Sequence, residues 1–121
     1  MGIEVTLRSA ERSESRLHVR EELTNRRGVI HGGALMGWAD TMGGMTASAA
    51  IREDQRTATI ESKTNFLAPI EKGDTAHAVC TPIHSGRTTI VLQTNITRGD
   101  GQLAAIVIQT QIILPAKPRS A

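Results

Sequence analysis

The hydrophobic pattern divides the chain into a short alternating start, one long apolar segment and a series of alternating segments. Apolar and polar residues alternate over residues 3–7, as they do in a half-buried β-strand. After a polar turn at residues 11–14, the alternation resumes over residues 17–23. This pattern predicts strands at the start of the chain.

The segment His31–Ile51 is rich in Ala, Met and Leu, has no strand alternation and is long enough for a helix. It contains five glycines, which are Gly32, Gly33, Gly37, Gly43 and Gly44. A glycine inside a helix costs about 1 kcal/mol relative to alanine. We therefore expect a deeply buried helix that other backbone approaches closely.

A membrane-spanning helix is the alternative for this segment, because Gly33 and Gly37 have the small-xxx-small spacing of membrane helices. Asp40 would then lie near the middle of the span, at a cost of roughly 2.5–3.5 kcal/mol. The rest of the chain has the character of a soluble domain, so the buried helix is favoured.

Four strand-like segments follow from Thr57 onward, separated by turns at residues 71–74, 85–87 and 98–101. In the first, the residues sharing one side are Ala58, Ile60, Thr64, Phe66 and Ala68, and the segment ends at Pro69. The second runs over about residues 75–83, and the third has Ile90, Leu92 and Ile96 on one face. The last has Ile106, Ile108, Ile112 and Leu114 on one side and Gln109 and Gln111 on the other.

Consecutive hairpins would make this sheet largely antiparallel. The element order therefore predicts an α+β fold, with one long helix against one face of an antiparallel sheet. The length of 121 residues suits a single domain over residues 1–121. Residues 115–121 contain two prolines and are expected to form a loose C-terminal tail.

The composition, with 39% hydrophobic and 21% charged residues, is that of an ordinary globular domain. Fourteen basic and twelve acidic side chains leave a net charge of only +2 without a long basic run, and the aromatic residues are one Trp and one Phe. Nucleic-acid binding is disfavoured, since it needs a basic stripe or aromatic stacking platforms. A core with so few rings buries less surface per residue, so we expect an oligomer.

The single cysteine, Cys80, excludes an intramolecular disulfide and cysteine-based zinc sites, and its strand-like surroundings favour a core position. The first residues lack a basic region followed by an apolar run, so no signal peptide is expected. Both observations favour a cytoplasmic protein.

One constellation of residues could carry chemistry, namely Asn25, His31, Gly32, Gly33 and Asp40. His31-Gly32-Gly33 falls where the loop gives way to the helix, whose first N–H groups lack partners inside the helix. Glycines without side-chain bulk let a ligand approach these N–H groups closely, as an oxyanion hole requires. A carboxylate in an otherwise uncharged helix is costly unless it is paired or functional.

Simpler roles remain open for these residues. His31 could cap the helix, and Asp40 could accept a hydrogen bond from Trp38 or from a backbone amide of a partner chain. His77 and His84 are interpreted as ordinary strand residues, because their spacing does not indicate a metal site.

At these residues the chain resembles a known family. The stretches Asn25–Asp40 and Asn65–Asp74 are similar to the hotdog-fold acyl-CoA thioesterases of the phenylacetate-degradation type. The similarity runs in order from about Ile3 to Leu114. Pro82–Arg87 resembles the branch that acts on hydroxybenzoyl- or dihydroxynaphthoyl-CoA.

The resemblance implies a long central helix wrapped by a curved antiparallel sheet. It implies homodimers joined sheet edge to sheet edge, with active sites at the dimer interface, and pairing of dimers into homotetramers. It implies hydrolysis of an aryl- or medium-chain acyl-CoA to the free acid and CoA, with no metal and no cofactor beyond the CoA of the substrate.

The resemblance also implies roles for individual residues. The N–H of Gly32 would polarise the thioester carbonyl, assisted by Asn25, while His31 would orient the carbonyl or Asn25. Asp40, from the opposite subunit, would act as nucleophile or as general base on water, which Thr59 would help to place.

The remaining site residues are expected to bind the substrate. Gly33 would leave room at the helix start, and the turn with His84, Ser85, Gly86 and Arg87 would hold the CoA phosphates through backbone amides and a guanidinium. Certain relatives carry a hydroxyl group at the position of Gly44, where it helps the thiolate to leave. In this chain Thr41 or His84 would have to supply that help.

Two other functions are compatible with the same fold. A hydratase or dehydratase would need a second catalytic histidine partnered to Asp40. A non-catalytic acyl-CoA-binding module would keep the glycines but would not need Asp40.

Overall fold

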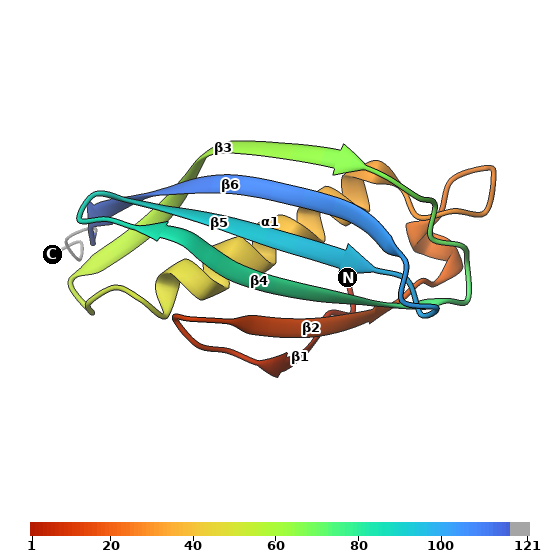
Figure 1. Cartoon of the computed structure of the whole chain (residues 1–121), viewed down its shortest axis with the longest axis horizontal. Helices are drawn as coiled ribbons and strands as arrows, with labels where there is room; N and C mark the ends of the chain where they lie inside the picture. The colour runs from red at the N-terminus through yellow and green to blue at the C-terminus, as the bar shows by residue number, and fades with distance from the viewer. Residues whose placement is uncertain (117–121) are drawn as a thin grey trace, which may run out of the picture.

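The computed structural model describes residues 1–116, which form one helix packed on a six-stranded antiparallel sheet (Figure 1). The elements in chain order are β1 (Glu4–Leu7), β2 (Ser13–His18), a short 3-10 helix (Glu21–Leu23), α1 (Gly32–Ser48), β3 (Gln55–Phe66), β4 (Thr75–Ser85), β5 (Thr89–Thr97) and β6 (Leu103–Pro115). The predicted α+β class and the single central helix are confirmed. The helix is three residues shorter at its C-terminal end than the predicted segment His31–Ile51.

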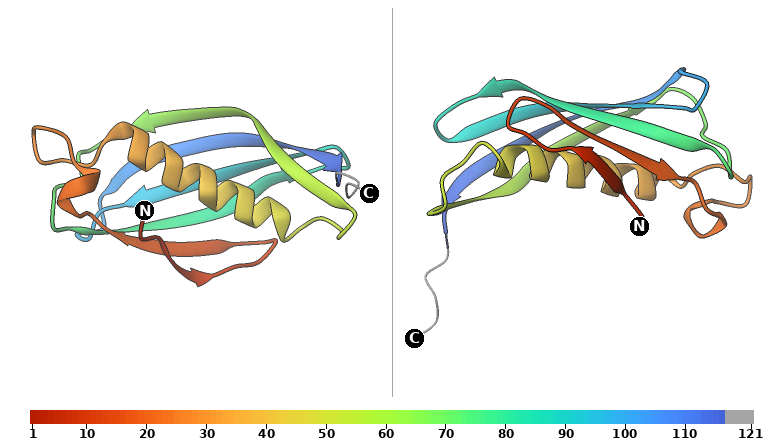
Figure 2. Two further views of the ribbon diagram at one scale, coloured as in Figure 1. Left: turned by 180° about the vertical axis from the view of Figure 1, so that it is seen from behind. Right: turned by 90° about the horizontal axis from the view of Figure 1, so that it is seen from below.

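The strand order in the sheet is β1-β2-β4-β5-β6-β3. Figure 2 shows the sheet curving around α1, which contacts the five strands β2 to β6. This is the helix-in-sheet arrangement expected of a hotdog fold.

The connection from β3 to β4 is not a hairpin. β3 pairs with β6 along its whole length, and residues 67–74 carry the chain from this edge of the sheet to β4, two strands beyond β6. Local turn signals did not reveal this crossing, because the pairing of β3 with β6 joins residues far apart in the sequence. β3 is thereby an edge strand of 12 residues.

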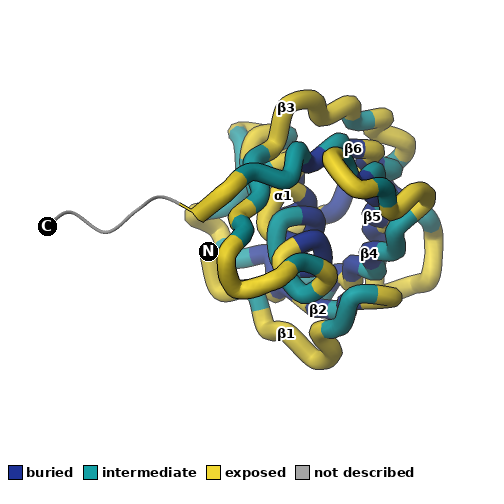
Figure 3. The backbone as a smooth tube through the Cα atoms, turned by 90° about the vertical axis from the view of Figure 1, so that its left-hand side faces the viewer, coloured by how far each residue is buried: buried dark blue, intermediate teal, exposed yellow. Residues whose placement is uncertain are grey.

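The core lies between the helix and the concave face of the sheet (Figure 3). Leu35, Trp38 and Met42 of α1 pack against a sheet face to which β5 contributes Leu92 and Ile96, as its predicted alternation requires. The expected approach of other backbone to the helical glycines is wrong, because the atoms that a Cβ would meet there, among the described residues, belong to side chains. At Gly43 a Cβ atom would lie 2.2 Å from the side-chain amide of Gln109, so a side chain takes the space that the glycine leaves. At Gly33 and Gly44 a Cβ atom would meet nothing within 4 Å.

Strand β6 turns its polar side toward the helix. Val107, Gln109 and Gln111 are buried, while Ile108 on the other side is 39% exposed. Two glutamines in a core need hydrogen-bond partners, and these partners prove to be part of the site described below.

Strand β3 does not keep one face from Ala58 to Ala68. The register against β6 shifts between Thr59 and Glu61, which marks a β-bulge at Ile60. Ala58 stands opposite Ile112 before the bulge and Thr64 stands opposite Val107 after it. Ile112 and Val107 lie on opposite sides of β6, so the predicted shared side of β3 is wrong.

The ends of the chain differ in detail from the predicted pattern. β2 already begins at Ser13, inside the predicted turn, and Leu23 lies in the 3-10 helix rather than in a strand. Pro115 is the last residue of β6, and the N–H of Ala116 donates to the carbonyl of Asp54 at 2.9 Å. The rest of the predicted tail, residues 117–121, lies outside the described residues. In residues 1–116, no helix combines the length and the apolar character that a bilayer crossing requires.

Candidate active site

Asp40 and Thr59 form the centre of the candidate site. The Thr59 hydroxyl donates a hydrogen bond of 2.9 Å to Oδ1 of Asp40, joining the middle of α1 to edge strand β3. Both residues are exposed. Within residues 1–116, the second carboxylate oxygen of Asp40 accepts no hydrogen bond, so it can face a ligand.

Two buried glutamines lie behind this pair, and sequence reasoning missed them. Nε2 of Gln111 donates to Thr59 Oγ1 at 2.5 Å and to Oε1 of Gln109 at 2.7 Å. Nε2 of Gln109 donates to the carbonyl oxygen of Ala39 at 3.0 Å. The signal that could have found them is a pair of glutamines two residues apart, on one side of an otherwise apolar strand.

The strand register explains why these side chains meet. Thr59 stands directly opposite Gln111 in the β3–β6 pair, and residues two apart on a strand share a face, which places Gln109 beside Gln111. The bulge that follows Thr59 shifts the alternation of β3 at this point. Gly43 leaves the space that the Gln109 amide occupies against the helix.

The start of α1 offers unpaired donors. His31 occupies the N-cap position but its side chain makes no capping hydrogen bond, so the capping role left open for it is absent. Among the described residues, the N–H groups of Gly32 and Gly33 have no backbone partner, as expected for a first helical turn. Their partial positive charge suits a developing oxyanion.

Asn25 holds the loop that leads into the helix. Its Oδ1 accepts hydrogen bonds from the N–H groups of Arg27 at 2.9 Å and Val29 at 3.4 Å. With Oδ1 turned to the loop, the group that Asn25 can offer to a substrate is its NH2, which is a hydrogen-bond donor.

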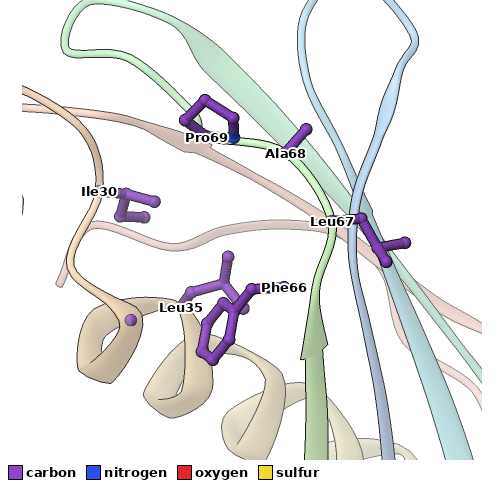
Figure 4. A pocket seen from close by; sticks show the side chains of 7 residues that line it. Ile30, Leu35, Phe66, Leu67, Ala68 and Pro69 are labelled. Atoms are coloured by element: carbon purple, nitrogen blue, oxygen red, sulfur yellow. The ribbon is translucent and has the colours of Figure 1, made fainter.

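An apolar pocket of about 310 Å³ opens beside Gly32 (Figure 4). It is lined by Ile30, Gly32, Leu35, Phe66, Leu67, Ala68 and Pro69. The Phe66 ring packs so close that a Cβ atom at Gly32 would lie 3.2 Å from it. An apolar group bound here would lie next to the free N–H groups of the helix.

The structure does not bring Gly32 and Asp40 of one chain together. Eight residues of α-helix correspond to a rise of about 12 Å and a turn of about 80° between side-chain directions. A reacting carbonyl must lie about 3 Å from both groups. One chain alone therefore cannot place both on the same carbonyl.

The turn after β4 and the start of α1 lie at opposite ends of the folded molecule (Figure 1). The N–H of Gly86 donates to the carbonyl of Thr89 at 2.8 Å, so this amide is not free for a phosphate. Arg87 shares a hollow of about 200 Å³ with Arg52, which sequence reasoning also missed. His84 and Ser85 are exposed at the end of β4.

Other polar residues near the helix have structural partners. Nε1 of Trp38 donates to Ser15 at 2.9 Å, so Trp38 does not bind Asp40. The Thr41 hydroxyl donates to the carbonyl of Gly37 at 3.0 Å. Cys80 is buried, as predicted, and burial raises the pKa of its thiol.

A comparison with protein families shows which family the chain belongs to. The model of the thioesterase superfamily matches residues 27–105, a range that contains the helix start, Asp40, Thr59 and the turn after β4. The chain belongs to the thioesterase superfamily. By family it is a thioester hydrolase, and its helix-in-sheet structure is the hotdog fold.

Individual relatives of this thioesterase agree with the family match. A Saccharolobus solfataricus protein named "Putative esterase" is 36% identical over 99 residues, which cover 81% of this chain and 69% of that protein. A thioesterase structure from Haemophilus influenzae superposes with a TM-score of 0.89 at 24% identity, covering 98% and 82% of the two chains. A Streptococcus mutans structure bound to acetyl CoA superposes with a TM-score of 0.89 at 21% identity, covering 98% and 93%.

Proposed function

We propose that this thioesterase hydrolyses an aryl- or medium-chain acyl-CoA to the free acid and CoA at sites formed by two copies of the chain. The observation that carries the proposal is the carboxylate of Asp40, which Thr59 holds on an exposed helix face. It stands two turns from the unpaired N–H of Gly32, the donor suited to a thioester oxygen.

The distance along the helix supports a site shared between two chains. Because Gly32 and Asp40 of one chain are about 12 Å apart along the axis, the Asp40 that acts at a given Gly32 must come from a second copy. The edge strand β3 carries Thr59 and also the exposed Ile60 and Phe66. A long edge strand presents unpaired N–H and C=O groups that can pair with another chain, and pairing of two β3 edges would produce the homodimer.

The chemistry needs only these groups. The Gly32 N–H, assisted by Asn25 and His31, polarises the carbonyl, while the partner copy's Asp40 accepts a proton from a water placed by Thr59. The new C–O bond produces an oxyanion whose collapse breaks the C–S bond. The thiolate leaves and takes up the proton as CoA, which is an easy departure because thiolates are stable near neutral pH.

The pocket beside Gly32 supports an apolar acyl group. Its lining by residues 66–69 and Ile30 has the size and polarity to take an aromatic ring or a medium-length chain. This preference would place the enzyme with the phenylacetate-degradation type, near the hydroxybenzoyl- and dihydroxynaphthoyl-CoA branch. Gly33 would admit the substrate at the helix start.

The CoA portion of the substrate would lie along the turn after β4 of one of the two chains. Arg87 would bind phosphate, and His84, Ser85 and Gly86 would line the approach. Arg52 lines the same hollow but is paired with Asp54 at 3.2 Å. Two solved structures of this fold were determined with acetyl CoA and with coenzyme A, from Streptococcus mutans and Streptococcus pneumoniae. Pairing of dimers into a homotetramer is part of the same proposal.

The decisive experiment measures thiol release from benzoyl-, hydroxybenzoyl-, phenylacetyl-, hexanoyl- and palmitoyl-CoA by the parent and by Asp40→Asn. We expect turnover of an aryl or medium-chain member and a loss of about 10²-fold or more in Asp40→Asn. Glu14→Gln on strand β2 is the matched control, because it removes a half-buried carboxylate whose one salt bridge among residues 1–116 is with Arg12.

The outcomes separate the rival functions. If the parent releases no thiol while acyl-CoA raises its melting temperature, the protein is a binding module and the proposal is wrong. A single turnover in H2¹⁸O tests direct attack by Asp40. The carboxylate would form a mixed anhydride, and water opening it at the Asp40 carbonyl would leave ¹⁸O on Asp40, whereas general-base catalysis leaves ¹⁸O in the released acid alone.

A further inference from the structure

The polar side of strand β6 is connected to the proposed catalytic carboxylate by an unbroken set of hydrogen bonds. The bonds run from the Ala39 carbonyl through Gln109, Gln111 and Thr59 to Asp40. Because Ala39 and Asp40 are neighbours in α1, the set begins and ends on adjacent residues. These hydrogen bonds therefore fix both the backbone of Ala39 and the side chain of Asp40.

The direction of each bond follows from chemistry. A carbonyl oxygen only accepts, so the group of Gln109 that faces Ala39 must be its NH2. The Gln109 oxygen then faces Gln111, which must turn its own NH2 toward it. The two hydrogens of that NH2 serve Gln109 and Thr59.

These bonds leave the Thr59 hydroxyl group with one orientation. Its oxygen accepts from Gln111, so its hydroxyl proton is free to point at Asp40 Oδ1. A threonine without this neighbour could instead rotate its hydroxyl and accept or donate elsewhere. Both glutamines are 1% exposed, so water does not compete for these bonds.

Two buried glutamines carry a risk to the stability of the fold. A buried amide without partners costs about 1–3 kcal/mol, and apolar residues at both positions would pack without this risk. The helix also carries a glycine at position 43, where a Cβ atom would lie 2.2–2.4 Å from all three atoms of the Gln109 amide group. The sheet and the helix are thus both shaped around the glutamine pair.

We propose that Gln111 and Gln109 are positioning residues of this thioesterase, which hold the Thr59 hydroxyl as a donor to Asp40 and so fix which oxygen of the carboxylate faces the substrate. The proposal rests on the proposed role of Asp40. The glutamines touch neither substrate nor water in this scheme, so their effect on turnover must pass through Thr59.

The test is a double-mutant cycle between Gln111→Leu and Thr59→Val, read as kcat and KM on the preferred thioester. In the parent background, Gln111→Leu should lower kcat about 10-fold and leave KM within about twofold. In the Thr59→Val background, the same change should alter kcat by less than about twofold, because the connection is already cut. Gln93→Leu is the matched control, since this glutamine lies on β5 and, within the described part of the chain, its side chain donates to Asn95 alone.

The outcomes are separable. An equal loss of kcat from Gln111→Leu in both backgrounds, or no loss beyond that of Gln93→Leu, overturns the positioning role. Should Gln111→Leu not fold, as judged by circular dichroism and oligomer size, Gln109→Met replaces it with the same expectation of a loss that Thr59→Val removes. If the parent releases no thiol, or Asp40→Asn is as active as the parent, the proposed function itself fails and the positioning role fails with it.

Discussion

The hydroxyl of Thr59 donates to the carboxylate of Asp40 at 2.9 Å across a sequence separation of 19 residues. The bond links the helix to β3, one of the two edge strands of the sheet, so the acid is held in place at an edge that a second chain can reach. Neither residue is buried, and the pair therefore combines a defined geometry with access to substrate.

Replacing Thr59 by valine should lower kcat on the preferred thioester. The change keeps the shape of the side chain but removes a hydrogen bond to a charged group, worth about 1.5–3 kcal/mol, which corresponds to a loss of about 10- to 100-fold. Thr59→Ser keeps the hydroxyl and should lose far less. Equal kcat values for the valine and serine variants would show that the hydroxyl plays no part.

Gly43 and its neighbour Gly44 should respond in opposite ways to alanine. At Gly43 the added Cβ atom would collide with the Gln109 amide, so Gly43→Ala should destabilise the fold by about 1–3 kcal/mol. At Gly44 nothing lies within 4 Å, so Gly44→Ala should stabilise the helix by up to about 1 kcal/mol. Urea denaturation measures both, and a stabilised Gly43→Ala would contradict the close contact.

The overall architecture could be predicted from the sequence because it rests on local patterns. The apolar segment after His31 lacks alternation and forms the helix, and the turns at residues 85–87 and 98–101 join antiparallel neighbours. The crossing from β3 to β4 could not be predicted in this way, because no local pattern records that β3 pairs with β6.

The site could be predicted only in part for a similar reason. Gly32 stands out because a helix rarely contains so many glycines, and Asp40 stands out because it is the one charged residue of an otherwise uncharged helix. The alternation places Gln109 and Gln111 on the side of the last strand opposite the isoleucines, and both glutamines are buried while Ile108 is exposed. Their burial is explained by partners on two other elements, which become visible only when β3, β6 and α1 are packed together.

Asp100 should titrate at unusually low pH. Arg98 donates from two of its nitrogens to the two oxygens of Asp100, and this pairing lowers the carboxyl pKa from 3.8 to about 2. Because the folded-state pKa is depressed, the stabilisation is complete above about pH 4 and is lost as the pH falls through about 2.

The measurement is an NMR titration of the Asp100 carboxyl carbon in the parent and in Arg98→Gln. Removing the guanidinium should return the pKa of Asp100 toward 3.8. The return should be incomplete, because the N–H of Gln102 donates to Oδ1 at 3.0 Å and also lowers this pKa. A midpoint that stays near 2 in Arg98→Gln would mean that Arg98 is not the main cause.

Two inactive variants should restore activity together if the site is shared between chains. Gly32→Val places bulk against the Phe66 ring and blocks the helix start, while Asp40→Asn removes the carboxylate. A dimer with one chain of each kind keeps one site in which Gly32 and Asp40 are both intact and loses the other.

Co-expression with two different affinity tags, followed by purification on both, isolates these mixed dimers. They should show about half the kcat per dimer of the parent, as a two-fold symmetric assembly requires. A site built within one chain would leave the mixed dimers as inactive as either variant alone, because each chain would still carry its own defect.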